Sequence, residues 1–319
     1  MEDVDAPKTA ETRNRTALLL LNPNARRGDE PIDGALELLR DSGIRLIEPA
    51  THDRKEISTA ITWYADEVDM VIVGGGDGSL NAAAPGLVET GLPLGILPLG
   101  TANDLARTLE IPFTVVDAAR VIVGGETRPL DLGIVNDIYF FNVASIGFSA
   151  KLARVLTSDA KRRFGKLGYA ISAMKLVSQS RSFSAEIEHD GHVDKVRTLQ
   201  ISVGSGRYYG GGLAVDESAE PDDGRLDVYS LEINHWTELV PLLPALKAGT
   251  QKRWKNVRTF GTTELTVRTK RPLDINADGE ILTTTPARFG LRPRAVTVYV
   301  PEETEDEGLF SLAGLTGSH

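Results

Sequence analysis

The first 130 residues alternate between two patterns of apolar and polar positions. Short apolar runs of the kind found in buried strands lie at 17–22, 44–50, 70–75 and 92–99. Apolar residues at helical spacing lie between them, at 35–39 and 57–65 and in segments that begin near Leu80, Asn103 and Val115. Strands that alternate with helices predict a parallel sheet covered on both faces, and such sheets bind ligands at the carboxyl ends of their strands.

After about residue 128 the pattern changes to strands linked by turn signals. Asn136-Asp137 and Asp190-Gly191 each separate two strand-like runs and suit hairpin turns. Further strands are expected at 225–233, 264–269, 273–277 and 295–300, and one helical insert at 161–179. This half therefore predicts an antiparallel sandwich or barrel.

Four segments follow from these patterns. A flexible arm (1–15) precedes an α/β domain (16–129), a β domain follows (130–300), and an acidic tail (301–319) ends the chain. The tail could fold back on the N-terminal domain, and neither terminal segment is given a role.

Composition narrows the classes of protein to consider. The 319 residues are 41% hydrophobic, which is enough for two domains with their own cores. The absence of cysteine excludes disulfides and thiolate metal sites. The apolar stretch at 17–21 is too short to span a membrane and no signal-peptide pattern precedes it, so we expect a cytoplasmic protein. The net charge of −10 opposes general nucleic-acid binding.

Two glycine turns carry the candidate chemistry. The stretch GGGDGS (74–79) joins a buried strand to a helix, where backbone N–H groups can hold a phosphate. It is not a Walker loop, because the Lys-Ser/Thr ending is missing, nor the dinucleotide fingerprint, because Ser79 stands where a third glycine is required. A tight turn without ligand stays an alternative. Gly100 and Thr101 form a similar turn after the next strand, where Asn103 or Asp104 could cap the following helix, and two adjacent turns predict a polyphosphate site.

Six motifs occur in order along the chain, namely NPNA (22–25), GGGDGSLN (74–81), PLGTANDLAR (98–107), NVASIGFSA (142–150), GGG…PDDGRLDV (210–228) and NADGE (276–280). Together they resemble the diacylglycerol and sphingosine kinase superfamily, and most of all the bacterial soluble lipid kinases of the YegS and diacylglycerol kinase type. The resemblance spans about residues 17–300. Ser79 replaces the commoner Thr of the glycine motif but keeps the hydroxyl, and NPNAR lacks the Ser-Gly often seen after Asn-Pro.

The resemblance implies both a fold and an activity. The fold is an NAD-kinase-like doubly wound α/β domain followed by an antiparallel β-sandwich domain, with the active site in the cleft between them. The activity is ATP- and Mg²⁺-dependent transfer of the γ-phosphate to a lipid hydroxyl, with diacylglycerol as the default acceptor and phosphatidic acid as its product. By motif position the ATP-binding residues would be Thr51, Gly75, Gly76, Asp77, Gly78, Ser79, Leu80, Asn81, Thr101 and Asn103.

Catalytic and metal-binding roles also follow from the family pattern. It places the general base at Glu280, whereas Asp77 is the rival base, or else a loop organiser or Mg²⁺ ligand. A second, structural Mg²⁺ site would use the side chain of Asp223 and the backbone carbonyls of Glu220 and Arg225. Ordinary turns remain the alternative at Asp278-Gly279 and at 220–225.

Two basic runs suggest how a lipid could be reached. Residues 151–181 hold eight basic residues and one acid, and residues 247–258 hold five basic residues, no acid and Trp254. Such runs suit transient docking on an anionic membrane, with solvated helix faces or partners for acidic residues as the alternative. The other functions considered are a kinase of a soluble metabolite such as NAD and a non-catalytic nucleotide- or lipid-binding protein of the same fold. A homodimer is left open.

Overall fold

The computed structural model describes residues 15–22, 32–49, 55–150, 181–217, 219–233 and 238–302. The predicted helical insert at 161–179 and most of both terminal segments lie outside these ranges. Within them, no helix is long and apolar enough to cross a membrane.

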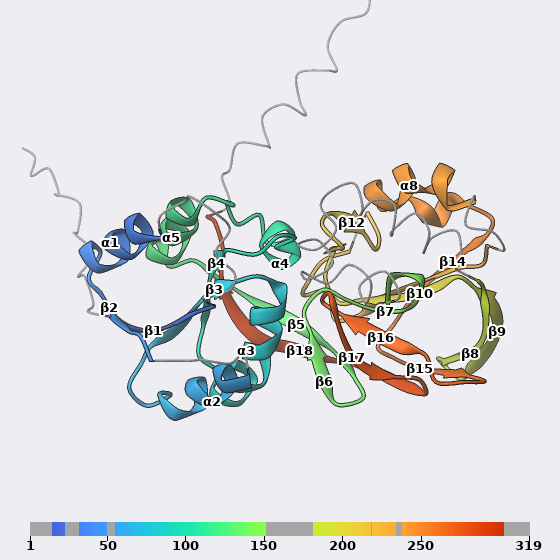
Figure 1. The fold of residues 1–319 in the computed structure, drawn as a ribbon, viewed down its shortest axis with the longest axis horizontal. Helices are drawn as coiled ribbons and strands as arrows, with labels where there is room; N and C mark the ends of the chain where they lie inside the picture. The colour runs from blue at the N-terminus through green and yellow to red at the C-terminus, as the bar shows by residue number, and fades with distance from the viewer. Residues whose placement is uncertain are drawn as a thin grey trace, which may run out of the picture.

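The N-terminal half contains the predicted parallel sheet. Its strands are β2 (Ile44–Ile47), β1 (Arg15–Leu21), β3 (Met70–Gly75) and β4 (Leu94–Pro98), hydrogen-bonded in that order. Its helices are α1 (Asp33–Asp41), α2 (Lys55–Trp63), α3 (Asp77–Thr90), α4 (Asp104–Thr108) and α5 (Val115–Gly124). Figure 1 shows α1 and α5 above the sheet and α2 and α3 below it. Helices therefore cover both faces, as the alternating pattern predicts.

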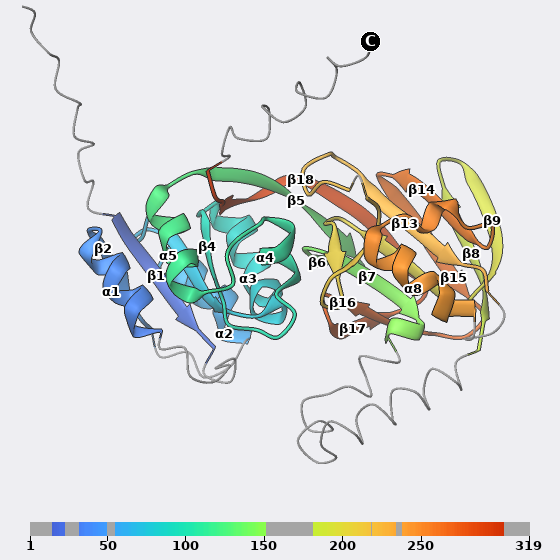
Figure 2. The same ribbon diagram turned by 90° about the horizontal axis from the view of Figure 1, so that it is seen from above.

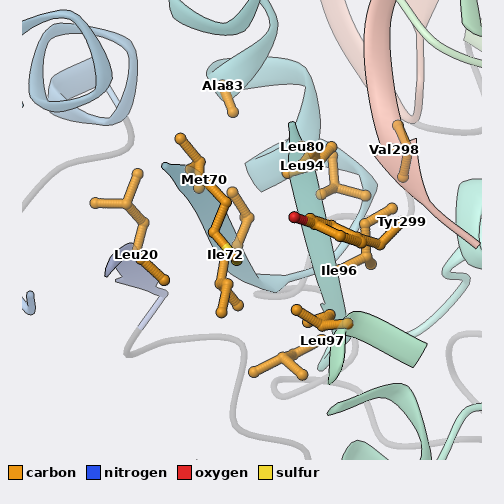
Figure 3. Packing of buried hydrophobic residues seen from close by; sticks show 14 of the residues in the cluster. Leu20, Met70, Ile72, Leu80, Ala83, Leu94, Ile96, Leu97, Val298 and Tyr299 are labelled. Atoms are coloured by element: carbon orange, nitrogen blue, oxygen red, sulfur yellow. The ribbon is translucent and has the colours of Figure 1, made fainter. Parts of the chain in front are cut away.

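Strands buried on both faces explain the unbroken apolar runs in this half. Leu18, Leu19 and Leu20 of β1 are all at most 2% exposed, and Met70 and Ile72 of β3 are completely buried. Figure 3 shows Val298 and Tyr299, from the last strand of the chain, packed among the side chains of β3 and β4. A parallel sheet needs apolar side chains on both faces, so its strands show no alternation.

Two long strands join the halves of the molecule. β5 (Thr127–Val135) and β18 (Ala287–Tyr299) pair antiparallel, and the end of β18 pairs parallel with β4 at Val298 and Leu94. The strand expected at 295–300 is thus part of a longer one (Figure 2). β5 also contributes to the hydrophobic cores of both halves: Leu130 belongs to the core of the N-terminal half and Val135 to the core of the C-terminal half. The boundary between 129 and 130 stays a prediction.

The C-terminal half is antiparallel. A six-stranded sheet has the order β14 (Val257–Thr262), β13 (Leu226–Leu231), β10 (Gln200–Gly204), β7 (Val143–Gly147), β16 (Asp274–Ala277) and β17 (Glu280–Thr284). Its inner face packs on β18 and on β8 (Phe183–His189), β9 (His192–Thr198) and β15 (Glu264–Thr269). β5 and β6 (Ile138–Phe140) turn at Asn136-Asp137, and β8 and β9 turn at Asp190-Gly191, so both expected hairpins are present.

A helix and a small hairpin cover the outer face of the six-stranded sheet. The helix is α8 (Leu239–Ala248), and the hairpin consists of β11 (Tyr208–Tyr209) and β12 (Leu213–Ala214). Sequence reasoning missed α8 because Pro241 and Pro244 argue against a helix. Pro241 is tolerated because it lies in the first turn, where its missing N–H has no helical partner; Pro244 lies inside the helix at an exposed position.

Candidate active site

The two glycine turns lie against each other at the carboxyl ends of β3 and β4. A Cβ atom on Gly100 would lie 2.4 Å from the Cα of Gly76, and a Cβ on Gly75 would lie 2.5 Å from the Cβ of Ser79. Gly74, Gly75 and Gly76 all lack a positive φ. These glycines are therefore required by close approach, and not by a left-handed backbone.

Helix α3 begins at the first of these turns. Gly76 is the N-cap, without a side-chain hydrogen bond, and Asp77 is the first of 14 helical residues. The N-terminus of a helix carries a partial positive charge and favours anions. This end of α3 is therefore suited to a phosphate, as the sequence predicts.

The carboxylate of Asp77 links the two turns. Its Oδ1 accepts a hydrogen bond from the backbone N–H of Leu105 at 3.1 Å, in the first turn of α4. Burial raises the pKa of Asp77, and backbone hydrogen bonds, that of Leu105 first among them, act in the opposite direction. The side chain thus acts as an acceptor for the N-terminus of the neighbouring helix.

Asp104 links the N-terminal half to the small hairpin. Both oxygens of its carboxylate lie 3.0 Å from the backbone nitrogen of Gly211, in the loop between β11 and β12. Burial, and then the negative charge of Asp77, raise the pKa of Asp104 to about 6. The sequence suggested helix capping for this residue, and the structure adds a contact between the two halves.

Asp278 makes the most extensive of these contacts. Its carboxylate accepts hydrogen bonds from the backbone N–H groups of Phe141 at 2.7 Å, Asn142 at 2.9 Å and Val143 at 3.2 Å. The side-chain amide of Asn81, on α3, donates a fourth at 3.1 Å. Desolvation nevertheless raises the pKa of Asp278 to about 6. Asn81 therefore holds α3 to the C-terminal half.

The three carboxylates line one end of a cavity between the halves. The cavity has a volume of about 330 Å³ and is otherwise lined largely by apolar side chains. Those side chains come from the outer face of the six-stranded sheet, from α8 and from the hairpin, and they are Val143, Phe148, Leu213, Leu231, Leu239 and Leu246. A cavity of this size with an acidic end and an apolar body is typical of a small-molecule site.

The side chain of Asn103 shapes the second turn. Asn103 is buried and has a φ of 50°, in the left-handed region that asparagine tolerates. Its Oδ1 accepts from the N–H of Gly100 at 2.9 Å, and its Nδ2 donates to the carbonyls of Pro98 and Gly100. These contacts give Asn103 a structural role in the turn. They do not test its contact with ATP, which stays a prediction.

Other predicted ATP-binding residues differ in their exposure. Ser79 is buried, and its hydroxyl accepts a hydrogen bond from the side-chain amide of Asn22 at 3.0 Å. Leu80 belongs to the hydrophobic core of the N-terminal half. Thr101 is exposed. Thr51 lies outside the described residues.

Glu280 is the first residue of β17 and follows a tight turn. Asp278 and Gly279 form that turn with φ of 48° and 90°, and Ala277 pairs with Glu280. Asp278 and Gly279 line the cavity, whereas Glu280 is partly exposed and is not among the lining residues. The structure thus places the predicted base directly beside the acidic end of the cavity.

The predicted structural metal loop is held by protein contacts. Asp223 accepts from the backbone N–H of Arg225 at 3.1 Å and pairs with its guanidinium at 3.2 Å. Asp222 pairs with Arg128, and the backbone N–H of Gly224 donates to Asp131 at 2.8 Å. Burial raises the pKa of Asp223. Both Asp223 oxygens therefore already have partners in the loop.

The described residues contain no group of three or more His, Asp or Glu side chains arranged to hold a metal ion alone. A Mg²⁺ site here would consequently need backbone carbonyls, water or phosphate as further ligands, which is how Mg²⁺ is commonly bound beside nucleotides. The acidic end of the cavity fits this donor set, because its carboxylates supply hard oxygen ligands next to the glycine turns.

The second basic run is largely paired. Lys252 lies 3.3 Å from Asp216, Arg253 3.6 Å from Glu217, and Arg258 2.6 Å from Glu232. These pairs match the alternative in which the basic residues serve the acids of the chain. Lys247, Lys255 and Trp254 are exposed at the end of the α8 region. All but the last residue of the first basic run, 151–181, lie outside the described residues.

Comparisons with known proteins agree with this arrangement. A family model described as a diacylglycerol kinase catalytic domain matches residues 16–135, and one described as the YegS C-terminal NAD kinase beta sandwich-like domain matches residues 142–300. The "Probable lipid kinase YegS-like" of Yersinia enterocolitica is 32% identical over 296 residues, which cover 90% of this chain and 98% of the relative. The chain belongs to the family of YegS-like lipid kinases and diacylglycerol kinases.

Two further relatives extend the match. A diacylglycerol kinase of Mycobacterium tuberculosis is 31% identical over 283 residues, which cover 84% of this chain and 89% of the relative. A crystal structure from Bacillus anthracis str. Sterne, assigned to a diacylglycerol kinase, matches with a TM-score of 0.76 and 25% identity over 91% of this chain and 99% of that one. The family resemblance, the fold class and the assignment to the lipid kinases are thereby confirmed.

Two carboxylates of the site had no predicted role in it. Asp278 was interpreted only as part of a turn and Asp104 only as a helix cap, yet both line the cavity with Asp77. The available signal was their position inside the motifs NADGE and PLGTANDLAR. Their partners are distant in the chain, so the motifs alone could not reveal their contacts.

Proposed function

We propose that this chain is an ATP- and Mg²⁺-dependent kinase that transfers the γ-phosphate to the hydroxyl of a membrane-derived lipid, with diacylglycerol as the default acceptor. The observation that carries the proposal is the cavity, which joins an apolar body to an acidic end beside two glycine turns. An apolar body suits acyl chains, and the acidic end adjoins the helix N-terminus suited to phosphate.

The glycine turns supply the phosphate site in this proposal. Because Gly76 and Gly100 lack side chains, the backbone of both turns can lie close to a triphosphate. The N-terminus of α3 adds a favourable field for negative charge. Phosphoryl transfer depends mainly on positioning and charge neutralisation, and Mg²⁺ bound with ATP would neutralise the phosphates.

We assign the general base to Glu280. The lipid hydroxyl oxygen attacks the γ-phosphorus, its proton passes to the carboxylate of Glu280, and the bond to the bridging oxygen of ADP breaks. Two observations favour Glu280 over Asp77. The carboxylate of Asp77 already accepts from the N-terminus of α4, and Glu280 adjoins a turn that lines the cavity. Asp77 then organises the turns.

The structural Mg²⁺ site at Asp223, with the carbonyls of Glu220 and Arg225, is kept as a secondary proposal. Its donor set is compatible with a hydrated Mg²⁺, but the loop has its own hydrogen bonds and ion pairs. We expect removal of Mg²⁺ to lower the thermal midpoint slightly in the absence of nucleotide, and Asp223→Asn to abolish that shift. An unchanged midpoint with and without EDTA would argue for an ordinary turn.

A lipid substrate must leave a bilayer, so we also propose transient docking on an anionic membrane. Exposed Trp254, Lys247 and Lys255 lie in the region of α8, which covers the cavity. We expect cosedimentation with vesicles to rise with phosphatidylserine content and to fall with salt. Binding that ignores both variables would contradict the docking proposal.

The central experiment is transfer of labelled γ-phosphate from ATP to lipids in mixed micelles. We expect diacylglycerol to be phosphorylated, and Glu280→Gln to lower kcat by about 10²-fold or more because general bases contribute about 10²- to 10⁴-fold. Glu264→Gln is the matched control, because Glu264 is also the first residue of a strand but pairs with Arg288 on the surface. An undiminished Glu280→Gln enzyme would move the base to Asp77.

The same assay separates the other functions. Phosphorylation of NAD without phosphorylation of any lipid would indicate a kinase of a soluble metabolite. Binding of ATP without turnover on either class of acceptor would indicate a non-catalytic protein of this fold. Either result would overturn the proposed function.

A further inference from the structure

The six-stranded sheet places polar side chains on its outer face in a regular way. On β7, Ala144 and Ile146 point into the sandwich core, whereas Val143 and Ser145 line the cavity. On β16, Asn276 lines the cavity while its neighbours belong to the core. Side chains of a strand alternate between faces, so Ser145 and Asn276 are positioned by their strands, whereas Asn142 directly precedes β7 and Ser149 follows it.

One group of these polar side chains is fully hydrogen-bonded within the protein. The Gln200 amide accepts from the N–H of Ser149 at 3.2 Å and donates to Ser202 and to the hydroxyl of Tyr229, each at 2.8 Å. That hydroxyl also contacts the hydroxyl of Tyr209. This part of the cavity wall therefore requires no polar ligand.

A second group in the same cavity has no protein partner. Both side-chain amide atoms of Asn142, the Nδ2 of Asn276 and the Oγ of Ser149 are buried and unpaired among the described residues. Asn142 is 2% exposed and Asn276 is 7% exposed, and all three residues line the cavity. Buried polar groups are nearly always paired with protein, water or ligand, and because these groups line a cavity they are open to the polar part of a bound molecule.

Asn142 and Asn276 lie at the acidic end of the cavity, whereas Ser149 follows the other end of β7, beside Gln200. The backbone N–H of Asn142 donates to Asp278 at 2.9 Å, and Asn276 lies two residues before Asp278. The Oδ1 of Asn276 accepts from the N–H of Gly279 at 3.1 Å, which holds its side chain with the Nδ2 unpaired. These amides are therefore fixed close to the point where the proposed transfer occurs.

The chemistry of the groups selects a class of ligand. Two side-chain NH₂ groups at this end can donate, so the ligand should present acceptor oxygens. An ammonium group would leave these donors unpaired, and an anionic group that brings no Mg²⁺ with it, unlike the nucleotide, would be repelled by the carboxylates of Asp77, Asp104 and Asp278. An uncharged carbonyl next to the accepting hydroxyl meets both conditions.

We propose that Asn142, supported by Asn276, binds the ester carbonyl of the acceptor lipid and thereby selects neutral ester lipids. The inference rests on the proposed function, because it concerns the lipid of that same site. Asn142 carries the main role, since its amide offers both a donor to the carbonyl and an acceptor for the adjacent hydroxyl.

The test compares 1,2-diacylglycerol with the dialkyl ether analogue of equal chain length in mixed micelles. We expect wild-type protein to show at least a tenfold higher kcat/KM on the ester. Asn142→Ala should remove most of this preference by lowering kcat/KM on the ester, while the KM for ATP stays unchanged. Asn276→Asp, which keeps the Oδ1 acceptor of the Gly279 N–H and removes the unpaired Nδ2, should lower the preference by a smaller factor.

Ser230→Ala is the matched control. Ser230 also has a buried, unpaired hydroxyl, but it lies on the six-stranded sheet away from the cavity lining. It should leave the ester preference unchanged. Thermal melting of each variant checks folding, and Asn276→Asp carries the test if Asn142→Ala fails to fold.

The outcomes separate the two proposals. Equal kcat/KM on ester and ether in the wild-type protein, or equal losses on both lipids in Asn142→Ala, would overturn the inference and leave the lipid kinase proposal standing. Absence of transfer to either lipid would overturn the proposed function and the inference with it.

Discussion

Substitution of Gly100 by alanine tests whether contact between the glycine turns builds the phosphate site. The new Cβ would lie 2.4 Å from the Cα of Gly76 and 2.6 Å from the Oδ1 of Asn103. Carbon atoms in contact are normally about 3.5–4.0 Å apart, so the turns would have to separate by roughly 1 Å. Because the main obstacle is backbone, rotation of a side chain cannot relieve the clash.

The expected loss of stability follows from overpacking. Insertion of a methyl group into a well-packed site typically destabilises by about 1–3 kcal/mol, and a backbone obstacle favours the upper end. For a chain of about 300 residues that loss corresponds to a fall in thermal midpoint of about 1.5–2 °C per kcal/mol. Separation of the turns should also raise the KM for ATP at least tenfold, if they hold the phosphates as proposed.

Circular dichroism melting and steady-state kinetics measure both effects, with Gly124→Ala as control. Gly124 lies in the last turn of α5, and a Cβ there would have no neighbour within 4 Å. Gly124→Ala should leave the KM for ATP unchanged and keep or slightly raise the midpoint. If Gly100→Ala melts and binds ATP like the wild-type protein, contact between the turns does not shape the phosphate site.

Two further predictions concern Asp104. Its pKa is raised from the ordinary value of 3.8 to about 6 in the folded protein, so the folded state binds more protons than the unfolded state between these pH values. The stability that this gives is lost as the pH rises from about 4 to 6. One pKa unit corresponds to about 1.4 kcal/mol, so the change that Asp104→Asn makes in the free energy of unfolding should be about 3 kcal/mol more stabilising at pH 7 than at pH 4. Denaturant titrations measure this change, and an equal effect at both pH values would contradict the pKa shift. Asp104→Ala should also speed hydrogen exchange of the Gly211 amide, which donates to this carboxylate, while the Gly279 amide, bonded to Asn276, exchanges as before. Unchanged exchange at Gly211 would show that Asp104 does not hold the hairpin.

Elements with a strong local pattern could be predicted from the sequence, and those that depend on distant contacts could not. The apolar runs of β1 and β3 follow from burial on both faces, and the Asn136-Asp137 turn follows from residues that tolerate positive φ. The sequence predicts the two glycine turns but not why glycine is required in them, because the contact between Gly76 and Gly100 exists only once β3 and β4 are paired.

In the candidate site, too, features set by neighbouring residues could be predicted and contacts between distant residues could not. The Asp278-Gly279 turn could be predicted from two adjacent residues, whereas the hydrogen bonds of the Asp278 carboxylate come from residues more than 130 positions earlier. The second basic run suggested a membrane surface because sequence alone hides ion partners such as Glu232, which lies 26 positions before Arg258. Local spacing therefore predicts turns and faces, while partners require the folded chain.

The carboxylates at the acidic end of the cavity also connect the parts of the molecule. Asp77 joins the two glycine turns, Asp104 joins α4 to the hairpin, and Asp278 joins β7 to α3 through Asn81. Charge at this end and the position of the cavity walls are consequently coupled, so loss of activity on removing any one carboxylate would not by itself identify a base. An asparagine variant keeps a hydrogen-bond acceptor and removes the charge, whereas an alanine variant removes both. Comparison of the two at each position separates the chemical role of a carboxylate from its role in holding the cavity together, and only a residue whose asparagine or glutamine variant is already inactive can be the base.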